Sequence, residues 1–524
     1  MAEWSPGPEL APLPALGSNS REEEPSAVGR RAPPAAYRQT LHRTLGSFSS
    51  FAAGFSYLSI LTGMFQQFHV GFRAGGPAFF WSWPAVFVGQ FLVALCFAEL
   101  AAHYPLAGSI YQWSKHTVSW AVGLMAGWVY LASYLISIAA VALALQVTLP
   151  QIDPRFEILD DPNQNAVLLG CVLITFTTLI NAAGVRLLAR INNLGVFAEL
   201  IGAVLLILLL AGHAQRGPGI VFQTQGRAAG QPWGYLGPFL AAAIMASYVM
   251  YGFDTAGSLA EETTAPERKV PWAILQALAT AAFLGALVLL FGLMAADDLR
   301  DPRLGEETGG LPLLVTTTLG PVLGRVFLAD VIFAITVCTL AVHTGTVRLL
   351  FAMARDNNLP FSRSLARVSS TSHTPIVPAV AAGVLAILLL VGNVHFPHLM
   401  DAVCSVAIVW ANLAYLLVTV PLLIQRLRGW PAKEGLPQKG VFRLGRWGLP
   451  INLLAVGSGV VIILNIGWPR EEIYGSAWYE RFAAPLFTGI LVLMGGVYYG
   501  MVQRHKTGVL EEHRASHDRF LANS

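Results

Sequence analysis

The residues best suited to chemistry lie in and just after one apolar segment. The stretch ASYVMYGFDTAGSLAEETTAPERKVP, residues 246–271, places Asp254 inside an apolar run and Glu261-Glu262 one or two helical turns later. A charge at the centre of a bilayer costs about 2.5–3.5 kcal/mol even on an insertion scale. Asp254 is therefore expected to face protein or a water-filled cavity, where it caps a broken helix end or holds a cation or proton.

Two further ionisable residues lie inside apolar runs, Glu199 and His343. A buried Glu can bind a proton, coordinate a cation, or make an inter-helix hydrogen bond in its protonated form. Histidine titrates near neutral pH, but a single histidine in an apolar helix equally suits an inter-helix hydrogen bond. We take both residues as candidate ion- or proton-coupling groups.

Composition explains why such residues must lie within a membrane. Of the 524 residues, 55% are hydrophobic and only 12% are charged, whereas a soluble domain has about 25% charged residues. The net charge of +3 gives no reason to expect a nucleic-acid partner. The four cysteines are far apart inside apolar runs, so neither a metal site nor disulfides are expected. No metal cluster, nucleophile elbow or phosphate loop is present, which argues against an enzyme and against a cofactor.

Twelve apolar runs approach or exceed the roughly 20 residues that span a bilayer as a helix. An even number places both termini on the same side. We expect residues 1–44 to form a disordered cytoplasmic tail, 45–505 the membrane domain, and 506–524 a second cytoplasmic tail. The runs lie near residues 48–68, 78–101, 121–149, 166–183, 191–212, 236–260, 270–295, 322–347, 377–394, 399–424, 449–468 and 483–503.

The distribution of basic residues predicts the orientation. With a cytoplasmic N-terminus, 24 of the 33 Lys and Arg fall on the cytoplasmic side, as the positive-inside rule requires. The other nine then lie outside: Arg73, Arg155, Arg216, Arg227, Arg300, Arg303, Arg325, Arg470 and Arg481.

Two spans contain candidate helix breaks, GFSYLSILTGMF (54–65) in the first and YGFDTAGS (251–258) in the sixth. Unwound backbone inside a bilayer is tolerated only where protein or a water-filled cavity satisfies it. Breaks in the first and sixth helices are what two inverted five-helix repeats would give. Small residues that allow close helix packing would be the simpler explanation of either segment alone.

Several motifs, in the same order, resemble the amino acid–polyamine–organocation permeases. AEETTAPERKVP (260–271), FAELAAHYPLAGSIYQW (97–113) and RLLFAMARDNNLP (348–360) carry the general resemblance. SYLSILTG (56–63), GGPAFFWSWP (75–84) and PLAGSIYQWSK (105–115) are similar to the branch that carries amino acids, γ-aminobutyrate and choline.

The resemblance covers residues 45 to 505 and implies an all-α integral membrane fold with twelve transmembrane helices of the leucine-transporter type. Its inverted repeats would span about 45–212 and 235–424, with two peripheral helices over about 449–503. It also implies secondary transport of amine-bearing solutes by alternating access.

The resemblance further implies a substrate site at the two breaks. The N–H groups of Thr62 and Gly63 would bind a substrate carboxylate, and carbonyl groups around Gly252 would accept hydrogen bonds from its ammonium group. Leu61-Thr62-Gly63 departs from the family's usual Gly-Ser/Ala-Gly, which is compatible with non-α-amino acids or choline. The expected substrate-binding residues are Ser59, Ile60, Leu61, Thr62, Gly63, Met250, Tyr251, Gly252, Phe253 and Asp254. Aromatic residues that suit a quaternary ammonium are Tyr57, Tyr130, Tyr134, Tyr248 and Tyr251.

The same comparison implies coupling and gating roles. Glu199 aligns with a lysine of proton-coupled members, which replaces the sodium ion of sodium-coupled relatives. Phe253 would be an aromatic gate over the site. Glu261 and Glu262 would belong to an inner gate, paired with Arg268, Lys269 or a neighbouring loop, and Arg355 would brace it.

The sequence thus predicts a multi-pass plasma-membrane permease for an amino acid or γ-aminobutyrate, proton-coupled or exchanging. A choline or other organic amine transporter is the alternative, followed by a nutrient sensor that does not transport. The expected partners are a small amine-bearing substrate, the lipid bilayer and a coupling proton. The sequence does not determine an oligomeric state.

Overall fold

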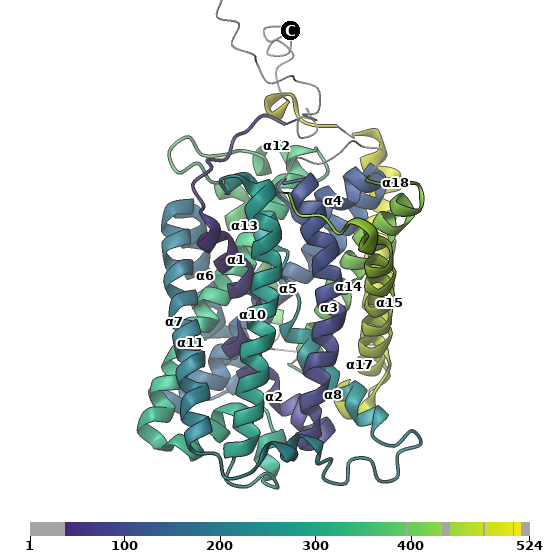
Figure 1. The fold of residues 1–524 in the computed structure, drawn as a ribbon. Helices are drawn as coiled ribbons and strands as arrows, with labels where there is room; N and C mark the ends of the chain where they lie inside the picture. The colour runs from purple at the N-terminus through teal and green to yellow at the C-terminus, as the bar shows by residue number, and fades with distance from the viewer. Residues whose placement is uncertain are drawn as a thin grey trace, which may run out of the picture.

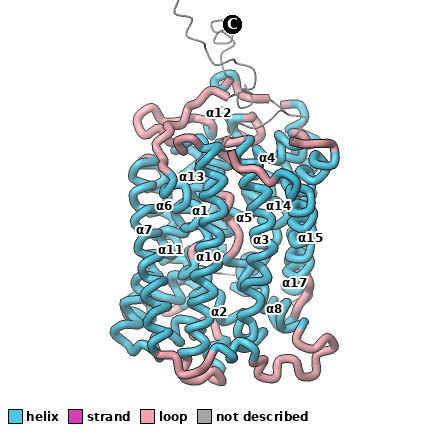
Figure 2. The backbone as a smooth tube through the Cα atoms, in the orientation of Figure 1, coloured by secondary structure: helices cyan, strands magenta, loops and turns pink. Residues whose placement is uncertain are grey.

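A computed structural model describes residues 37–514 except 393, 395–396, 432–440, 475–476 and 507. The regular secondary structure of these residues is helical (Figure 2). The extended backbone contributes only two isolated bridges among them, Tyr37 with Arg514 and Leu45 with Thr263. The predicted all-α architecture is confirmed.

The helices stand side by side as one bundle (Figure 1). The first half of the chain forms α1 (Ser47–Leu58), α2 (Ile60–Gly75), α3 (Ser82–His103), α4 (Ser109–Thr117), α5 (Trp120–Ile152), α6 (Pro162–Ala183), α7 (Val185–Gly212) and α8 (Leu236–Val249). The second half forms α9 (Thr255–Ser258), α10 (Pro266–Ala295), α11 (Gly310–Arg355), α12 (Ser362–Leu365), α13 (Ile376–Gly392), α14 (Pro397–Leu427), α15 (Gly448–Gly467), α16 (Glu471–Tyr474), α17 (Trp478–Arg481) and α18 (Ala483–Met501).

Each of the twelve expected spans coincides with a helix or with a broken pair of helices. Within the described residues, nine helical segments are long and apolar enough to cross a membrane. One of them, Ser47–His103, contains two expected spans, and the shorter apolar helices α8 and α13 supply the remaining two. Hydropathy alone therefore located the spans, because apolar length is what a bilayer selects.

Burial separates central helices from peripheral ones. The most apolar part of α5 is 78% buried within the protein, whereas the corresponding parts of α15 and α18 are only 28% and 11% buried. Side chains of α15 and α18 that do not face protein face the hydrocarbon. This agrees with the expectation that the last two spans are peripheral.

Both expected breaks are present. Ser59, with φ 25° and ψ 94°, separates α1 from α2. Residues 250–254 separate α8 from α9, and Gly252 adopts φ +90°. The two breaks touch, because a Cβ on Gly252 would lie 1.9 Å from Cδ1 of Tyr57. The same contact, together with the positive φ, explains why only glycine fits there.

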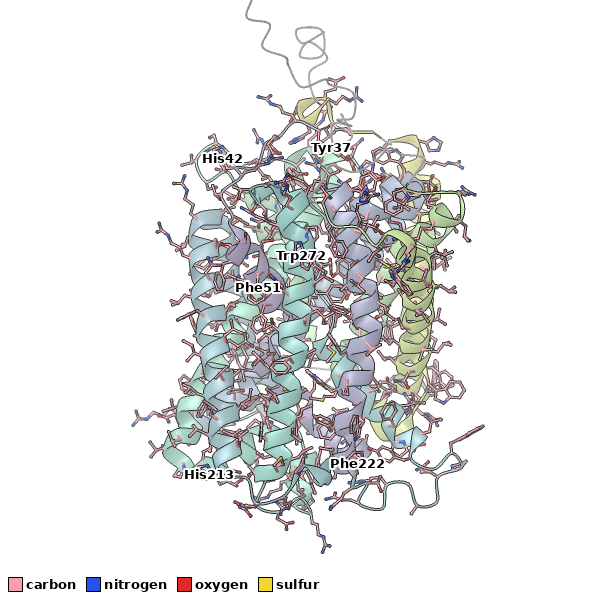
Figure 3. All side chains as sticks on the ribbon, viewed as in Figure 1. Tyr37, His42, Phe51, His213, Phe222 and Trp272 are labelled. Carbon is pink, nitrogen blue, oxygen red and sulfur yellow. The ribbon has the colours of Figure 1, made fainter. Side chains whose placement is uncertain are left out.

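Both described chain ends lie at one end of the bundle, which we call the terminal face. The backbone N–H of Arg38 donates to the carbonyl of His513 at 2.9 Å. Tyr37 and His42 lie on this face, and His213 and Phe222 lie on the opposite face (Figure 3).

We expected disorder through residue 44, but residues 37–44 are folded against the bundle, as are residues 508–514. Hydrogen bonds hold these segments, and so does Leu41, which is 2% exposed and packs with Ala107 and Phe351. A single buried leucine gives the sequence no helical apolar face. Residues 1–36 and 515–524 of the two predicted tails lie outside the described residues.

Candidate functional site

The carboxylate of Glu199, from α7, lies at the break between α1 and α2. It is 1% exposed. Its Oε1 accepts a hydrogen bond from the N–H of Leu61 at 3.1 Å and lies 2.9 Å from Oγ of Ser59. The first turn of a helix carries unpaired N–H groups and a partial positive charge. Glu199 therefore binds the start of α2 as an anion would.

The other N–H groups expected to hold a substrate carboxylate also have partners in this conformation. Thr62 N–H points to Oγ of Ser59 at 3.4 Å, and Gly63 N–H donates to the carbonyl of Ser59 at 2.9 Å. A Cβ on Gly63 would lie 2.7 Å from Val249 of α8, so the two half-helices are in close contact. Any ligand that binds these N–H groups requires local opening.

A small cavity of about 20 Å³ lies between the two breaks. A buried water molecule needs roughly 10–15 Å³ measured in this way, so the space holds one or two waters and no amino acid. The site is closed in this conformation. The cavity is lined by Tyr57, Leu58, Thr62, Gly63, Ser137, Val141, Tyr248, Tyr251, Cys338 and Val342.

Hydroxyl groups dominate the polar part of this lining. Oη of Tyr251 lies 2.9 Å from Oγ of Ser137, and Tyr248 donates to Gln66 at 2.8 Å. Oη of Tyr57 is buried without a hydrogen-bond partner among the described residues. A buried hydroxyl without a partner is costly, so Tyr57 offers an unused polar group to a bound molecule. Of the five tyrosines singled out from the sequence, three line the cavity.

The carboxylate of Asp254 is directed away from this cavity. It is fully buried and accepts hydrogen bonds from Ser109 and Tyr415, each at 2.8 Å, and from Tyr130. Its side chain makes no capping hydrogen bond to α9. Asp254 instead attaches the broken segment to α4, α5 and α14, and the hydroxyl groups compensate for the burial of its charge.

Residues on either side of Asp254 are also tightly packed. The ring of Phe253 lies 5.3 Å from that of Tyr415 and 5.9 Å from that of Phe97, centroid to centroid, and is not exposed. Met250 ends α8 and is fully buried. The N–H of Gly252 donates to Oη of Tyr415 at 2.7 Å.

His343 links three helices and lies apart from Glu199 and the cavity. Its Nδ1 lies 3.1 Å from Oγ1 of Thr177 on α6, and its Nε2 lies 3.0 Å from the carbonyl oxygen of Ala379 on α13. Both ring nitrogens are engaged when Nε2 carries the proton and Nδ1 accepts. This arrangement suits a neutral, structural histidine.

Two buried ion pairs, which we call the gate pairs, lie beneath the terminal face. Glu261 and Arg355 form a bidentate pair at 2.9 and 3.0 Å. Glu262 lies 3.1 Å from the guanidinium of Arg348. All four side chains are at most 5% exposed.

The pairing of these glutamates with Arg268, Lys269 or a neighbouring loop, which the sequence suggested, was wrong. The partners are arginines of α11, whereas Lys269, which we had considered, donates to Thr264 at 2.5 Å. Arg348 was not among the predicted site residues. Arg348 precedes Arg355 by seven residues, so both lie on the same face of α11. That spacing was the signal in the sequence that could have identified it.

The N-terminal segment covers the gate pairs. The ring of Tyr37 lies over the guanidinium of Arg355 at 3.8 Å. Its hydroxyl donates to the carboxylate of Asp356 at 2.7 Å, which also pairs with Lys115 at 2.6 Å. The C-terminal segment joins them, because Leu510 N–H donates to the carbonyl of Arg355 at 3.0 Å.

Burial shifts the titration of groups on this face. It lowers the pKa of Lys115, while the neighbouring Asp356 acts in the opposite direction. Burial, reinforced by the charge of Asp356, raises the pKa of Tyr37 above its usual range. Burial also lowers the pKa of His116 to about 4, and Lys115 acts in the same direction.

Comparisons with known proteins agree with this architecture. The family model described as amino acid permease matches residues 45–492. The chain is 26% identical to a GABA-specific permease of Saccharomyces cerevisiae, over 89% of this chain and 83% of the relative. It is 27% identical to amino-acid permease 2 of Neurospora crassa, over 90% and 87%. It is 25% identical to the branched-chain amino acid permease BcaP of Bacillus subtilis, over 82% and 89%.

The family match covers most of the chain, and the predicted resemblance and fold class are confirmed. The chain belongs to the amino acid permease family, whose members are transporters rather than enzymes.

Proposed function

We propose that the protein is a secondary transporter that moves an amino acid or a γ-aminobutyrate-like solute across the plasma membrane by alternating access. The observation that carries the proposal is the meeting of two helix breaks at one closed, hydroxyl-lined cavity. The names of the relatives support the substrate class.

In this proposal the substrate binds where the two breaks meet. After α2 and α8 separate, its carboxylate binds N–H groups of Thr62 and Gly63 at the start of α2. Its ammonium group binds carbonyls near Gly252 and the hydroxyls of Tyr57 and Ser137. Ser59, Ile60, Leu61, Met250 and Tyr251 shape the same site.

We propose Glu199 as the proton-coupling residue. As a carboxylate it holds Leu61 N–H and Ser59, whereas a protonated Glu199 holds them less strongly because it loses the attraction to the helix start. Proton binding would thereby loosen the start of α2 when substrate needs access to it. His343, with both nitrogens engaged, contributes helix packing instead.

We propose that Asp254 and Phe253 anchor the α8–α9 break to the surrounding helices. Phe253 then acts in gating by moving with this segment, since it does not contact the cavity.

Both termini are proposed to be cytoplasmic, as the distribution of basic residues predicts. The terminal face is then the inner face, and the gate pairs form the inner gate. Opening it separates Glu261 and Glu262 from Arg355 and Arg348, respectively.

An organic amine such as choline is the alternative substrate, and the tyrosine rings favour it. The ring of Tyr251 lies 5.6 Å from that of Tyr57 and 6.4 Å from that of Tyr248. Aromatic faces attract quaternary ammonium groups by roughly 2 kcal/mol when desolvated.

Uptake into proteoliposomes tests the proposal. Labelled γ-aminobutyrate, a mixture of amino acids and choline are compared, each with and without an inward proton gradient. Uptake of carboxylate-bearing solutes stimulated by the gradient supports the proposal. Uptake of choline alone would assign substrate binding to the tyrosine rings rather than to the N–H groups of Thr62 and Gly63. If no solute is taken up, transport of amino acids, γ-aminobutyrate and choline is contradicted.

A further inference from the structure

A cavity of about 1000 Å³ lies at the end of the bundle opposite the terminal face, away from the two helix breaks. Its walls come from α2, α8 and α15 and from the segments before α8 and after α15. These elements meet at the lower end of the bundle in Figure 1. The cavity is therefore separate from the proposed substrate site.

One wall of this cavity is apolar and continuous with the lipid-facing surface. Val461 and Leu464 of α15 are 59% and 64% exposed, and α15 is a peripheral helix. An exposed apolar side chain on a membrane helix contacts hydrocarbon, so the cavity opens sideways toward lipid. The apolar lining includes Val70, Ala74, Leu240, Ala241, Val461 and Leu464.

The rim of the cavity is cationic. Arg73, Arg227 and Arg470 line it against a single acid, Glu471. Glu471 itself lies 3.5 Å from Arg481. Neither Arg73 nor Arg227 has a carboxylate within 4 Å among the described residues. Three of the nine basic residues assigned to this side thus gather at one opening.

Two tryptophans mark the depth of the rim. Trp233 is 80% exposed and Trp468 is 64% exposed, and both line the cavity. Exposed tryptophan is enriched where a bilayer meets water, at the level of the lipid headgroups. The arginines therefore lie at headgroup depth and the apolar wall lies beside the acyl chains.

We propose that this cavity binds an acidic phospholipid. Its phosphate binds Arg73 and Arg227, and an acyl chain packs along α8 and α15. Charge complementarity selects an anionic lipid over a zwitterionic one, which brings no net charge to the rim. The apolar wall selects a lipid over a soluble anion, which would leave that wall uncovered.

The bound lipid would act on the half-helices that form the proposed substrate site. Asn465 of α15 donates to the carbonyl of Leu240 on α8 at 2.8 Å, and Arg470 donates to Oδ1 of Asn465 at 2.6 Å. The opposite wall of the cavity is α2. A lipid between them braces α2 and α8 against α15, so binding raises the thermal stability of this conformation.

Thermal unfolding of the full chain in a neutral detergent tests the proposal. Phosphatidylglycerol is titrated against phosphatidylcholine with the same acyl chains and against soluble glycerol 3-phosphate. The double variant Arg73→Gln/Arg227→Gln is compared with Arg155→Gln/Arg300→Gln. The control removes the same charge from exposed positions that do not line the cavity.

We expect phosphatidylglycerol to raise the unfolding temperature of the wild type more than phosphatidylcholine does. Loss of two arginines should raise the half-saturating lipid concentration by about 30-fold, whereas the control should leave it unchanged. An unchanged response in the Arg73/Arg227 variant would overturn the proposal. An equal response to glycerol 3-phosphate would also overturn it, in favour of a soluble anion.

A second variant keeps the arginines and fills the cavity. A Cβ on Gly237 would contact only Oε1 of Gln231, at 3.7 Å, so the position has room for a side chain. We expect Gly237→Phe to weaken the phosphatidylglycerol response at unchanged charge. A folded Gly237→Phe protein with the full response would show that the lipid binds elsewhere.

Discussion

The gate pair between Glu261 and Arg355 gives the sharpest test of the mechanism. Arg355 is fully buried and its two terminal nitrogens contact both carboxylate oxygens of Glu261. Arg355→Ala would leave Glu261 charged, buried and without its guanidinium partner, which costs about 3–5 kcal/mol. In the proposed cycle, opening of the terminal face hydrates Glu261, so this cost falls on the closed conformation.

The expected shift follows from that magnitude. Because 1.4 kcal/mol corresponds to a factor of ten, a cost of about 3–5 kcal/mol should raise the ratio of open to closed molecules by roughly two to four orders of magnitude. A cysteine placed at Ser258 reports the change, in a variant from which the four native cysteines have been removed. Ser258 lies on α9 and is 1% exposed. The rate of its modification by a small thiol reagent, measured in detergent, follows the open fraction until that fraction saturates.

Two comparisons separate gating from general destabilisation. Arg268→Ala removes a cation from the same face without touching a gate pair, and its modification rate should match that of the parent. The neutral double variant Glu261→Gln/Arg355→Gln should show a smaller increase than Arg355→Ala, because no unpaired charge is left buried. If Arg355→Ala stays folded and its cysteine reacts no faster, the gate assignment is refuted.

Three further perturbations test other parts of the structure. Glu199→Gln should flatten the pH dependence of uptake while substrate binding persists; a profile of unchanged shape would assign Glu199 to packing. Gly252→Ala combines positive-φ strain with a clash against Tyr57 and should lower stability by roughly 2–5 kcal/mol, whereas Gly496→Ala, which meets nothing within 4 Å, should not; equal unfolding temperatures would contradict the contact. His116 has a folded pKa of about 4, below the ordinary value of 6.5. The unfolded chain then binds more protons between these values, so stability is complete above pH 6.5 and falls by about 3 kcal/mol as the pH drops through 4. His116→Phe should remove this loss, as measured by unfolding temperatures at pH 4.5 and 7.5.

The spans and the breaks were predictable from the sequence because both depend on local properties. Apolar length identifies a membrane helix, and the Gly- and Ser-containing segments around Ser59 and Gly252 marked where helices end. Glu199 was recognisable as unusual because an acid in an apolar helix must find a partner.

The partners themselves were not predictable in the same way. Glu261 pairs with Arg355, 94 residues away, and Asp254 binds Tyr415, 161 residues away. Such pairs depend on how helices pack against one another, which no local pattern specifies. The folded stretch that begins at Tyr37 was missed for the same reason, since its hydrogen bonds, its ring over a guanidinium and its buried Leu41 all meet residues far away in the chain.

The covering of the gate by both chain ends has a thermal consequence. Residues 37–45 are held on the terminal face by hydrogen bonds, among them those from Thr44 and Leu45 N–H to the carbonyl of Glu262, each 2.9 Å long. In the proposed opening this segment is released, and each freed residue regains backbone entropy of about 1–2 kcal/mol at 25 °C. Opening would then cost enthalpy and gain entropy, so the open fraction should rise steeply on warming. Removal of the segment would abolish most of that temperature dependence and leave a gate whose opening responds mainly to its ion pairs.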